Sequence, residues 1–131
     1  MGFPLTPGDA ELVAAAQRII HLRWRRDWHT IGAALRTTSG RVFAAVNVDA
    51  NVGRLAVCAE AIAIGMGAAE GDTEIDTIVA VDRDGTVVSP CGMCRELISD
   101  YSPEARVLVP STSGPAVTAI RDLLPNKYSR S

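Results

Sequence analysis

Apolar and polar positions in the first half of the chain follow a helical period and then a strand period. The predicted helix covers residues 7–22, where apolar side chains recur at helical spacing: Leu12, Ala15, Ala16, Ile19 and Ile20. Residues 30–36 and 41–48 are rich in apolar and β-branched side chains, and a polar turn separates them, so they predict a strand pair. Residues 49–57 are predicted to form a loop.

The second half of the chain alternates between helical and strand patterns. The predicted elements are, in order, a helix over 58–69, a strand over 75–81, a short extended segment over 86–88, a helix over 91–101, a strand over 106–109 and a last helix near 117–124. Strands that alternate with crossover helices predict an α/β fold. We therefore expect a three-layer α-β-α sandwich with a mixed central sheet of about five strands.

Length and charge limit the kind of protein this can be. With 131 residues, 47% of them hydrophobic, the chain is expected to form one domain over residues 1–131 with a hydrophobic core. The formal net charge of −2 argues against a nucleic-acid-binding protein, and the basic run at 23–26 is interpreted as an exposed helix end. No stretch has the length of a membrane span, and the N-terminus lacks a signal-peptide pattern.

All three cysteines fall in two short motifs, C-A-E beginning at Cys58 and C-G-M-C from Cys91 to Cys94. Three thiolates leave one position open on a tetrahedral zinc, as in catalytic zinc sites. Zinc lowers the pKa of a bound water from about 15.7 towards 7, and a nearby carboxylate such as Glu60 suits a proton shuttle. The motifs therefore predict Cys58, Cys91 and Cys94 as zinc ligands and Glu60 as the catalytic acid and base.

Other interpretations of these residues stay open at this point. A Cys-x-x-Cys pair alone is compatible with a redox pair or a structural zinc site. A structural zinc usually has four protein ligands, and the candidates for the fourth, His21 and His29, lack a ligand-like spacing. Glu60 could be a solvated helix residue, but its neighbours are apolar, and a carboxylate on a buried helix needs a partner.

Three thiolates on Zn²⁺ carry a net charge of −1, which weakens the metal as a Lewis acid. We expect the N-termini of the helices that begin at Cys58 and Cys91 to offset this charge, because helix N-termini carry partial positive charge and free N–H groups. Arg95, directly after the last cysteine, is expected to support the thiolates from outside the ligand set. Because all three cysteines are needed reduced, a cytoplasmic location is expected.

With these motifs the chain resembles the cytidine deaminase family over nearly its whole length, including both cytidine deaminases and blasticidin S deaminases. The matching segments lie at residues 31–35, 47–49, 58–60, 89–95 and 123–128. The two zinc motifs are highly specific in combination, and the other segments support them. The resemblance implies a cytidine deaminase-like fold, Zn²⁺ as the cofactor on the three cysteines and Glu60 as the proton shuttle.

The resemblance also implies contacts to a nucleoside. It implies that Asn47 and Asp49 hold the sugar hydroxyls, and that the backbone at Ala59 and Ser89 recognises the edge of the cytosine. The aromatic residue that packs near the base aligns with Trp28 or with His29. The resemblance further implies a homotetramer with shared active sites, in which Tyr128 reaches into a neighbouring subunit's site.

Three positions depart from the family patterns and leave the substrate open. Asp49 stands where ordinary cytidine deaminases have a glutamate, and Ala61 stands where they often have an arginine. Blasticidin S deaminases place an arginine between the paired cysteines, where this chain has Met93.

The sequence as a whole predicts a hydrolase, namely a zinc-dependent deaminase that converts cytidine or deoxycytidine to uridine or deoxyuridine and releases ammonia. The alternative within the family is deamination of blasticidin S, which would mean antibiotic resistance in place of pyrimidine salvage. An alternative of another class is a non-catalytic, zinc-stabilised module that binds nucleosides. A polynucleotide-editing enzyme is a third possibility, but it needs an open basic groove. The expected partner is a small cytosine nucleoside, with no nucleic acid and no membrane.

Overall fold

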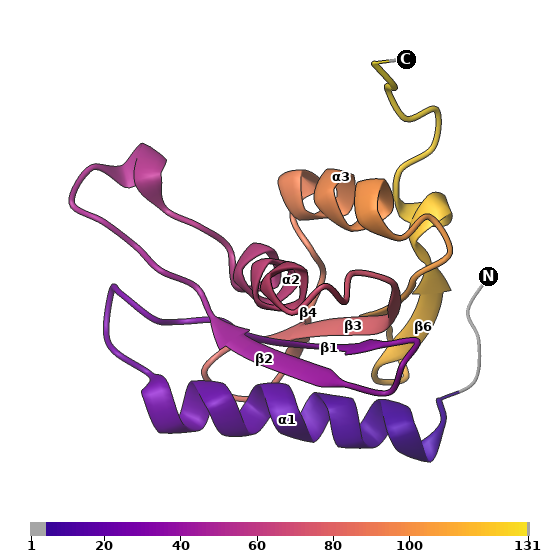
Figure 1. Ribbon diagram of the computed structural model, residues 1–131. Helices are drawn as coiled ribbons and strands as arrows, with labels where there is room; N and C mark the ends of the chain where they lie inside the picture. The colour runs from indigo at the N-terminus through magenta and orange to yellow at the C-terminus, as the bar shows by residue number, and fades with distance from the viewer. Residues whose placement is uncertain (1–4, 131) are drawn as a thin grey trace.

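The computed structural model describes residues 5–130 and is built on one mixed sheet (Figure 1). Its six strands are β1 (Gly32–Thr37), β2 (Val42–Val46), β3 (Ile75–Val81), β4 (Val87–Val88), β5 (Arg106–Val109) and β6 (Ala116–Ala119). The main strand order is β2-β1-β3-β5-β6, and β4 pairs with β3. Only the β3–β5 pair is parallel; the other neighbouring pairs are antiparallel. β1 pairs with the whole length of β3, so β4 and β5 share the opposite edge of that strand.

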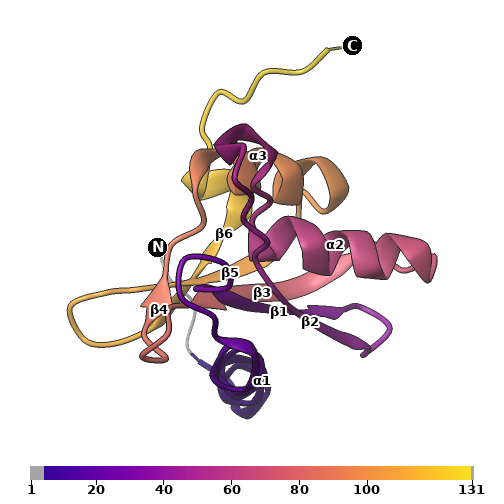
Figure 2. The ribbon, with the colours of Figure 1, turned by 90° about the vertical axis from the view of Figure 1, so that its left-hand side faces the viewer.

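One face of the sheet is covered by α1 (Pro7–Arg23) (Figure 2). This helix starts where the sequence places a strong start signal, because Thr6 and Asp9 form a reciprocal capping box and Pro7 occupies the first turn. Its apolar residues Leu12, Ala16 and Ile20 are buried against the sheet. Burial of this apolar stripe is what holds an amphipathic helix on a sheet.

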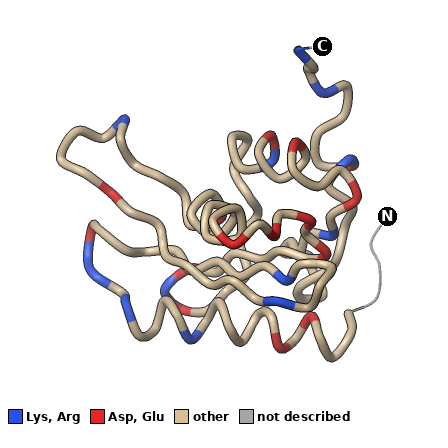
Figure 3. Tube along the Cα trace, in the orientation of Figure 1, with Lys and Arg blue, Asp and Glu red and all other residues tan. Residues whose placement is uncertain are grey.

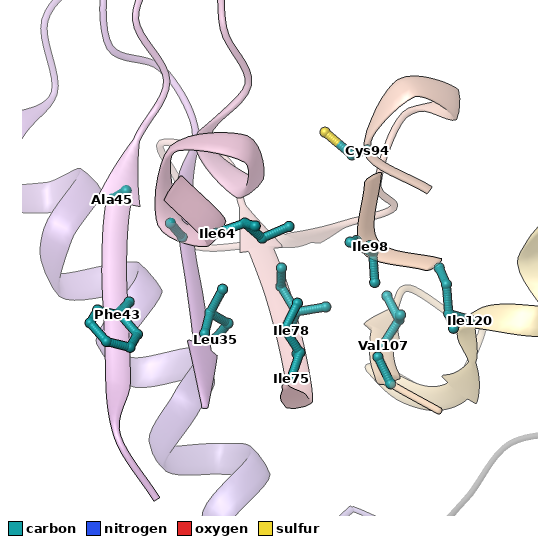
Figure 4. Close-up of a cluster of buried hydrophobic side chains, with 12 residues drawn as sticks. Leu35, Phe43, Ala45, Ile64, Ile75, Ile78, Cys94, Ile98, Val107 and Ile120 are labelled. Atoms are coloured by element: carbon teal, nitrogen blue, oxygen red, sulfur yellow. The ribbon is translucent and has the colours of Figure 1, made fainter. Parts of the chain in front are cut away.

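The opposite face is covered by α2 (Ala59–Ala69) and α3 (Gly92–Tyr101), which lie on the same side of the sheet (Figures 1 and 2). Figure 4 shows the buried cluster between these helices and the strands. Ile64 of α2 and Ile98 of α3 pack there against strand residues such as Leu35 and Ile78. Cys94 belongs to the same cluster, so this layer of the core also fixes one of the predicted zinc ligands.

The predicted three-layer fold is confirmed, and one predicted element is wrong. Residues 117–124 do not form an α-helix: the chain forms β6 and then a 3₁₀ turn, η2 (Ile120–Leu123). The free edge of β5 offers backbone partners, and β6 pairs with it in antiparallel register from Ala116 to Ala119. The β-branched side chains of Val117 and Thr118 suit that strand, so tertiary pairing overrides the local helical pattern.

Two general features complete the description. Acidic and basic residues are interspersed along the chain (Figure 3), and no helix within residues 5–130 is long and apolar enough to cross a bilayer.

A long loop joins β2 to α2 and contains the 3₁₀ turn η1 (Gly53–Leu55). Its two ends are held together by an antiparallel bridge between Val48 and Val57, which brings the end of β2 beside the start of α2.

Candidate active site

Two helix N-termini bring the three cysteines together. Cys58 is the N-cap of α2, and Cys91 is the N-cap of α3, with Cys94 in the first turn of that helix. The Sγ atoms of Cys58 and Cys91 are 3.7 Å apart, and the three Sγ atoms all lie within 4.8 Å of one another. Residues separated by 33 positions in the chain therefore form one cluster, as the sequence motifs predict.

The sulfur geometry fits a tetrahedral zinc ion. With Zn–S bonds of about 2.3 Å, the edge between two sulfurs of a regular tetrahedron is about 3.8 Å. The Cys58–Cys91 separation of 3.7 Å matches that edge. Cys91 is exposed and Cys94 is buried, so the cluster faces solvent on one side and the core on the other. Three thiolates supply a soft ligand set and leave a fourth position for water or substrate.

Glu60 lies in the first turn of α2, two residues after Cys58, and is only 6% exposed. Burial raises the pKa of its carboxyl group, and hydrogen bonds from its own backbone N–H and from the Cys94 thiol offset only part of that rise. A carboxyl group whose pKa is raised towards neutrality can both accept and return a proton near pH 7. The predicted role of Glu60 as a proton shuttle stays a prediction, and its burial two residues after Cys58 is compatible with it.

The thiols differ in how readily each becomes a thiolate. Burial raises the pKa of Cys94, and the charge of Glu60 raises it further. Burial also raises the pKa of Cys58. For Cys91 the effect of burial is outweighed by hydrogen bonds from the Cys94 backbone N–H and from both neighbouring thiols, so its pKa is lowered. A zinc ion held by these sulfurs would supply the positive charge that keeps all three deprotonated.

N-cap hydrogen bonds stabilise the thiolates less than expected. Neither cysteine side chain accepts a regular N-cap hydrogen bond. The backbone N–H groups of Cys94 and Met93 nevertheless lower the pKa of Cys91, against the opposing effect of burial. The positive end of α3 therefore acts on one thiol, and its effect is electrostatic stabilisation of the thiolate.

A pocket of about 250 Å³ opens beside the cysteine cluster. This is slightly below the range of about 300–1,000 Å³ that is typical for drug-sized ligands. Its lining includes four residues predicted to bind substrate or act on it: Asn47, Ala59, Glu60 and Ser89. Apart from Glu60 and the cysteines, its walls carry no titratable side chain among the residues that the structure describes. Apolar side chains therefore form most of the pocket wall outside Glu60 and the cysteines.

Sequence reasoning missed five apolar residues of the pocket wall: Ile31, Val48, Ala56, Val57 and Val88. Ile31, Val48 and Val88 lie within predicted extended segments, and Ala56 and Val57 end the predicted loop before Cys58. No residue type marks such positions as part of a site, because valine and isoleucine are also the usual residues of a core. Two signals could have found some of them: Ile31 and Val48 lie in segments that match the family, and Val57 and Val88 adjoin predicted site residues.

Asn47 holds the chain on one side of the pocket. Its Oδ1 accepts hydrogen bonds from the backbone N–H groups of Thr30 at 2.7 Å and Ile31 at 2.9 Å. Its Nδ2 donates to the carbonyl of Trp28 at 3.3 Å, and its own carbonyl contacts Nδ1 of His29 at 2.8 Å. An amide has two N–H donors, so one N–H of Asn47 stays available for a ligand.

Three other predicted substrate residues do not line this pocket in the single chain. Asp49 is exposed, and its Oδ1 accepts a hydrogen bond from the Ala50 N–H at 2.8 Å. Trp28 is half-buried in the turn after α1, with the Arg25 guanidinium 5.0 Å from its ring centre. Tyr128 is 78% exposed in the C-terminal segment, beside a groove along α3. Their contacts to a substrate stay predictions.

Arg95 is half-buried in the first turn of α3, directly after Cys94. Its Nε donates to the carbonyl of Pro90 at 2.8 Å, and its Nη1 donates to the carbonyl of Leu123 at 3.2 Å. The side chain therefore connects the segment before Cys91 to the end of η2. Both of these side-chain bonds end on carbonyl oxygens and not on sulfur, so the predicted support of the thiolates stays a prediction.

Comparison with known proteins identifies related sequences and structures. Residues 8–109 match the family described as the cytidine and deoxycytidylate deaminase zinc-binding region. The chain is 46% identical to a blasticidin-S deaminase from Bacillus cereus over 98% of this chain and 97% of that protein. It is 33% identical to a probable cytidine deaminase from Dictyostelium discoideum over 76% of this chain and 69% of that protein. The crystal structure of cytidine deaminase from Mycobacterium leprae has a TM-score of 0.80 and 28% identity, and the match covers 93% of this chain and 100% of that one.

Proposed function

The chain belongs to the cytidine and deoxycytidylate deaminase family, and on this premise we propose that it deaminates the cytosine ring of a free nucleoside by hydrolysis. The observation that carries the proposal is the convergence of Cys58, Cys91 and Cys94 beside the buried Glu60 at one pocket. The metal binding and hydrolytic chemistry are those of the family. A non-catalytic binding module gives no reason to bury a carboxylate at such a site.

The chain's own residues divide the reaction between them. Zinc held by the three sulfurs would supply the Lewis acidity that makes water a nucleophile at neutral pH. Glu60 accepts one proton from the attacking water and delivers it to the ring nitrogen. It then takes the second proton from the new hydroxyl group on the ring carbon and delivers it to the departing amino group. Water and the amino compound are thereby converted to a carbonyl compound and ammonia. The low exposure of Glu60 keeps bulk water from competing for these protons.

Substrate recognition is proposed to come from the backbone at the two helix starts. Ala59 is the first residue of α2, and its N–H belongs to the first-turn donors that have no partner within the helix. Ser89 also lines the pocket and lies two residues before Cys91. These backbone groups are suited to the polar edge of a cytosine, while the apolar wall packs on the ring. The remaining N–H of Asn47 is proposed to contact the sugar, with Asp49 as its partner.

The proposed function is tested by ammonia release from zinc-loaded protein with cytidine, deoxycytidine and blasticidin S side by side. We expect Glu60→Gln to retain zinc and to lose about 10²–10⁴-fold in turnover, because general acid–base catalysis contributes that much. Glu11→Gln is the matched control, since Glu11 is exposed on α1 on the other side of the sheet. Absence of ammonia release from all three nucleosides by the intact protein would refute the deaminase proposal.

Blasticidin S is the second candidate substrate. The identity to the Bacillus cereus blasticidin-S deaminase extends over nearly the whole chain and exceeds that to the cytidine deaminase relatives. This chain also has Asp49 and Ala61 where ordinary cytidine deaminases have a glutamate and often an arginine. Turnover of blasticidin S alone would support this candidate and a role in antibiotic resistance. Turnover of cytidine and deoxycytidine would support pyrimidine salvage.

We further propose that residues 1–131 act as a single deaminase domain, since all strands of residues 5–130 join one sheet.

We also propose that the protein is a cytoplasmic homotetramer and that it does not act on nucleic acid. The need for three reduced cysteines and the net charge of −2 support the location and the choice of a small substrate. The exposed Tyr128 supports a tail that meets a neighbouring subunit. Light scattering measures the assembly, and a monomer in solution would contradict it.

A further inference from the structure

Arg95 joins two segments that carry different parts of the molecule. Its Nε–H binds the Pro90 carbonyl at 2.8 Å, and its Nη1–H binds the Leu123 carbonyl at 3.2 Å. Pro90 is buried, and its carbonyl belongs to the peptide that leads directly into Cys91. Leu123 ends η2, from which the C-terminal segment continues to Tyr128.

The geometry points to Arg95 as a positioning residue that fixes the Pro90–Cys91 peptide and thereby the zinc site, and that couples this peptide to the C-terminal segment. The inference rests on the zinc binding that the function proposed above requires. It differs from direct support of the thiolates, because both hydrogen bonds of Arg95 end on backbone carbonyls.

The physical argument begins with the exposure of Cys91. Its side chain is exposed, whereas Cys94 is locked in the core cluster, so packing alone does not hold the Cys91 sulfur in place. Backbone hydrogen bonds must supply the constraint that packing does not. The Arg95 N–H bonds to the Cys91 carbonyl at 2.9 Å, and the Arg95 side chain bonds to the Pro90 carbonyl. One residue therefore fixes the two peptides on either side of the Cys91 Cα.

The guanidinium is suited to this task because its planar N–H groups have fixed directions. One edge reaches Pro90 and another reaches Leu123, so the orientation of either peptide depends on the other. A lysine ammonium is a single rotatable point charge and cannot reproduce both bonds with the same geometry. Groups that support metal ligands from outside the ligand set typically change metal affinity about 10–100-fold when they are replaced.

The test measures zinc affinity by competition with a chromophoric zinc chelator, in the full-length protein. We expect Arg95→Gln to weaken zinc binding by about 10–100-fold, and Arg95→Lys to weaken it by less. Arg121→Gln is the matched control: Arg121 lies in η2, and its guanidinium bonds to the Glu104 carboxylate and not to the Pro90 carbonyl. Its zinc affinity is expected to stay at the wild-type value.

Thermal melting of each zinc-free protein separates positioning from general stability. If Arg95→Gln and Arg121→Gln lower the melting temperature alike and only Arg95→Gln loses zinc affinity, the positioning role is supported. If zinc affinity is unchanged in both Arg95 variants, or falls equally in Arg121→Gln, the role is overturned. If Arg95→Gln does not fold, Arg95→Lys decides by the same two measurements. Lack of ammonia release by a wild-type protein that binds zinc would refute the proposed function and leave this inference standing.

Discussion

Asn47 is the single residue that most constrains the pocket wall. Its side chain makes three hydrogen bonds to the backbone of residues 28–31, and one of these residues, Ile31, lines the pocket. A substrate contact would use only the one N–H that is left. Asn47 thus combines two roles, a structural one that the geometry shows and a binding one that is proposed.

Substitutions at Asn47 separate these two roles. Asn47→Ala leaves the N–H groups of Thr30 and Ile31 without an acceptor, so we expect a loss on the order of 2 kcal/mol in unfolding free energy and a raised KM. Asn47→Asp keeps an acceptor but removes the donor, so we expect a raised KM with a smaller loss of stability. Urea unfolding and steady-state kinetics measure both effects. Unchanged stability in the alanine variant would show that the wall does not depend on this side chain.

The structure brings together the residues of the predicted metal site, whereas the predicted substrate contacts stay predictions. Cys58, Cys91 and Cys94 are recognisable because thiolates at this spacing have few other uses, and the structure brings them together. Trp28 and Asp49 depend on the path of two loops, and sequence patterns contain little information on where a loop places a side chain. The five bonds that Asn47 makes to residues 28–31 through side chain and backbone depend on contacts between distant segments.

At the scale of elements, α2 is positioned by a close contact at its C-terminal end. Gly67 is buried there, and its carbonyl accepts a hydrogen bond from the Asp72 N–H at 2.8 Å. A Cβ at Gly67 would lie 2.5 Å from the Asp72 carbonyl oxygen, which is too close for any side chain. Gly65 lies two residues earlier in the same helix. A Cβ placed there would meet nothing within 4 Å.

The two glycines of α2 make a matched pair for substitution. We expect Gly67→Ala to destabilise the protein by about 1–3 kcal/mol, because the backbone at Asp72 must move. We expect Gly65→Ala to stabilise it by up to about 1 kcal/mol, because alanine has the higher helix propensity and meets no neighbour. Urea unfolding of both variants measures the difference. Equal effects would contradict the close approach of α2 to the turn that follows it.

Strands and helices with a clear period were predicted within one or two residues, as for α1, β3 and β5. The segment at 117–124 was not, because four residues of β6 lie on an edge that only tertiary structure defines. A short run such as Ala-Val-Thr-Ala fits either a strand or a helix by composition. The available edge of β5 decides between them.

At the scale of the whole molecule, a buried ion pair connects α1 to the sheet. The Asp9 side chain is fully buried, and both of its oxygens accept hydrogen bonds from Arg106 of β5 at 2.9 Å. Burial raises the pKa of Asp9, but the bonds and charge of Arg106 together with the Thr6 N–H outweigh it, so the net pKa is lowered. The ion pair therefore links the helix layer to the centre of the fold.

This ion pair predicts an acid-sensitive contribution to stability. The pKa of Asp9 is lower in the folded protein than its unfolded value of about 3.9, so the contribution is complete above that value and is lost as the pH falls through the folded pKa. Asp9→Asn removes one partner of a buried pair, and we expect a loss on the order of 3 kcal/mol at pH 7. Urea unfolding of both proteins from pH 7 to pH 3 should show the two stabilities converging in acid. Parallel curves would exclude Asp9 as the source.

The placement of every cysteine of the chain at one site also has a consequence for oxidative chemistry. No other thiol is present to react with an oxidant or an alkylating reagent first. Any such modification therefore removes a predicted zinc ligand, and we expect the exposed Cys91 to react first. A simple titration of reactive thiols would count free sites directly, without background from the rest of the protein.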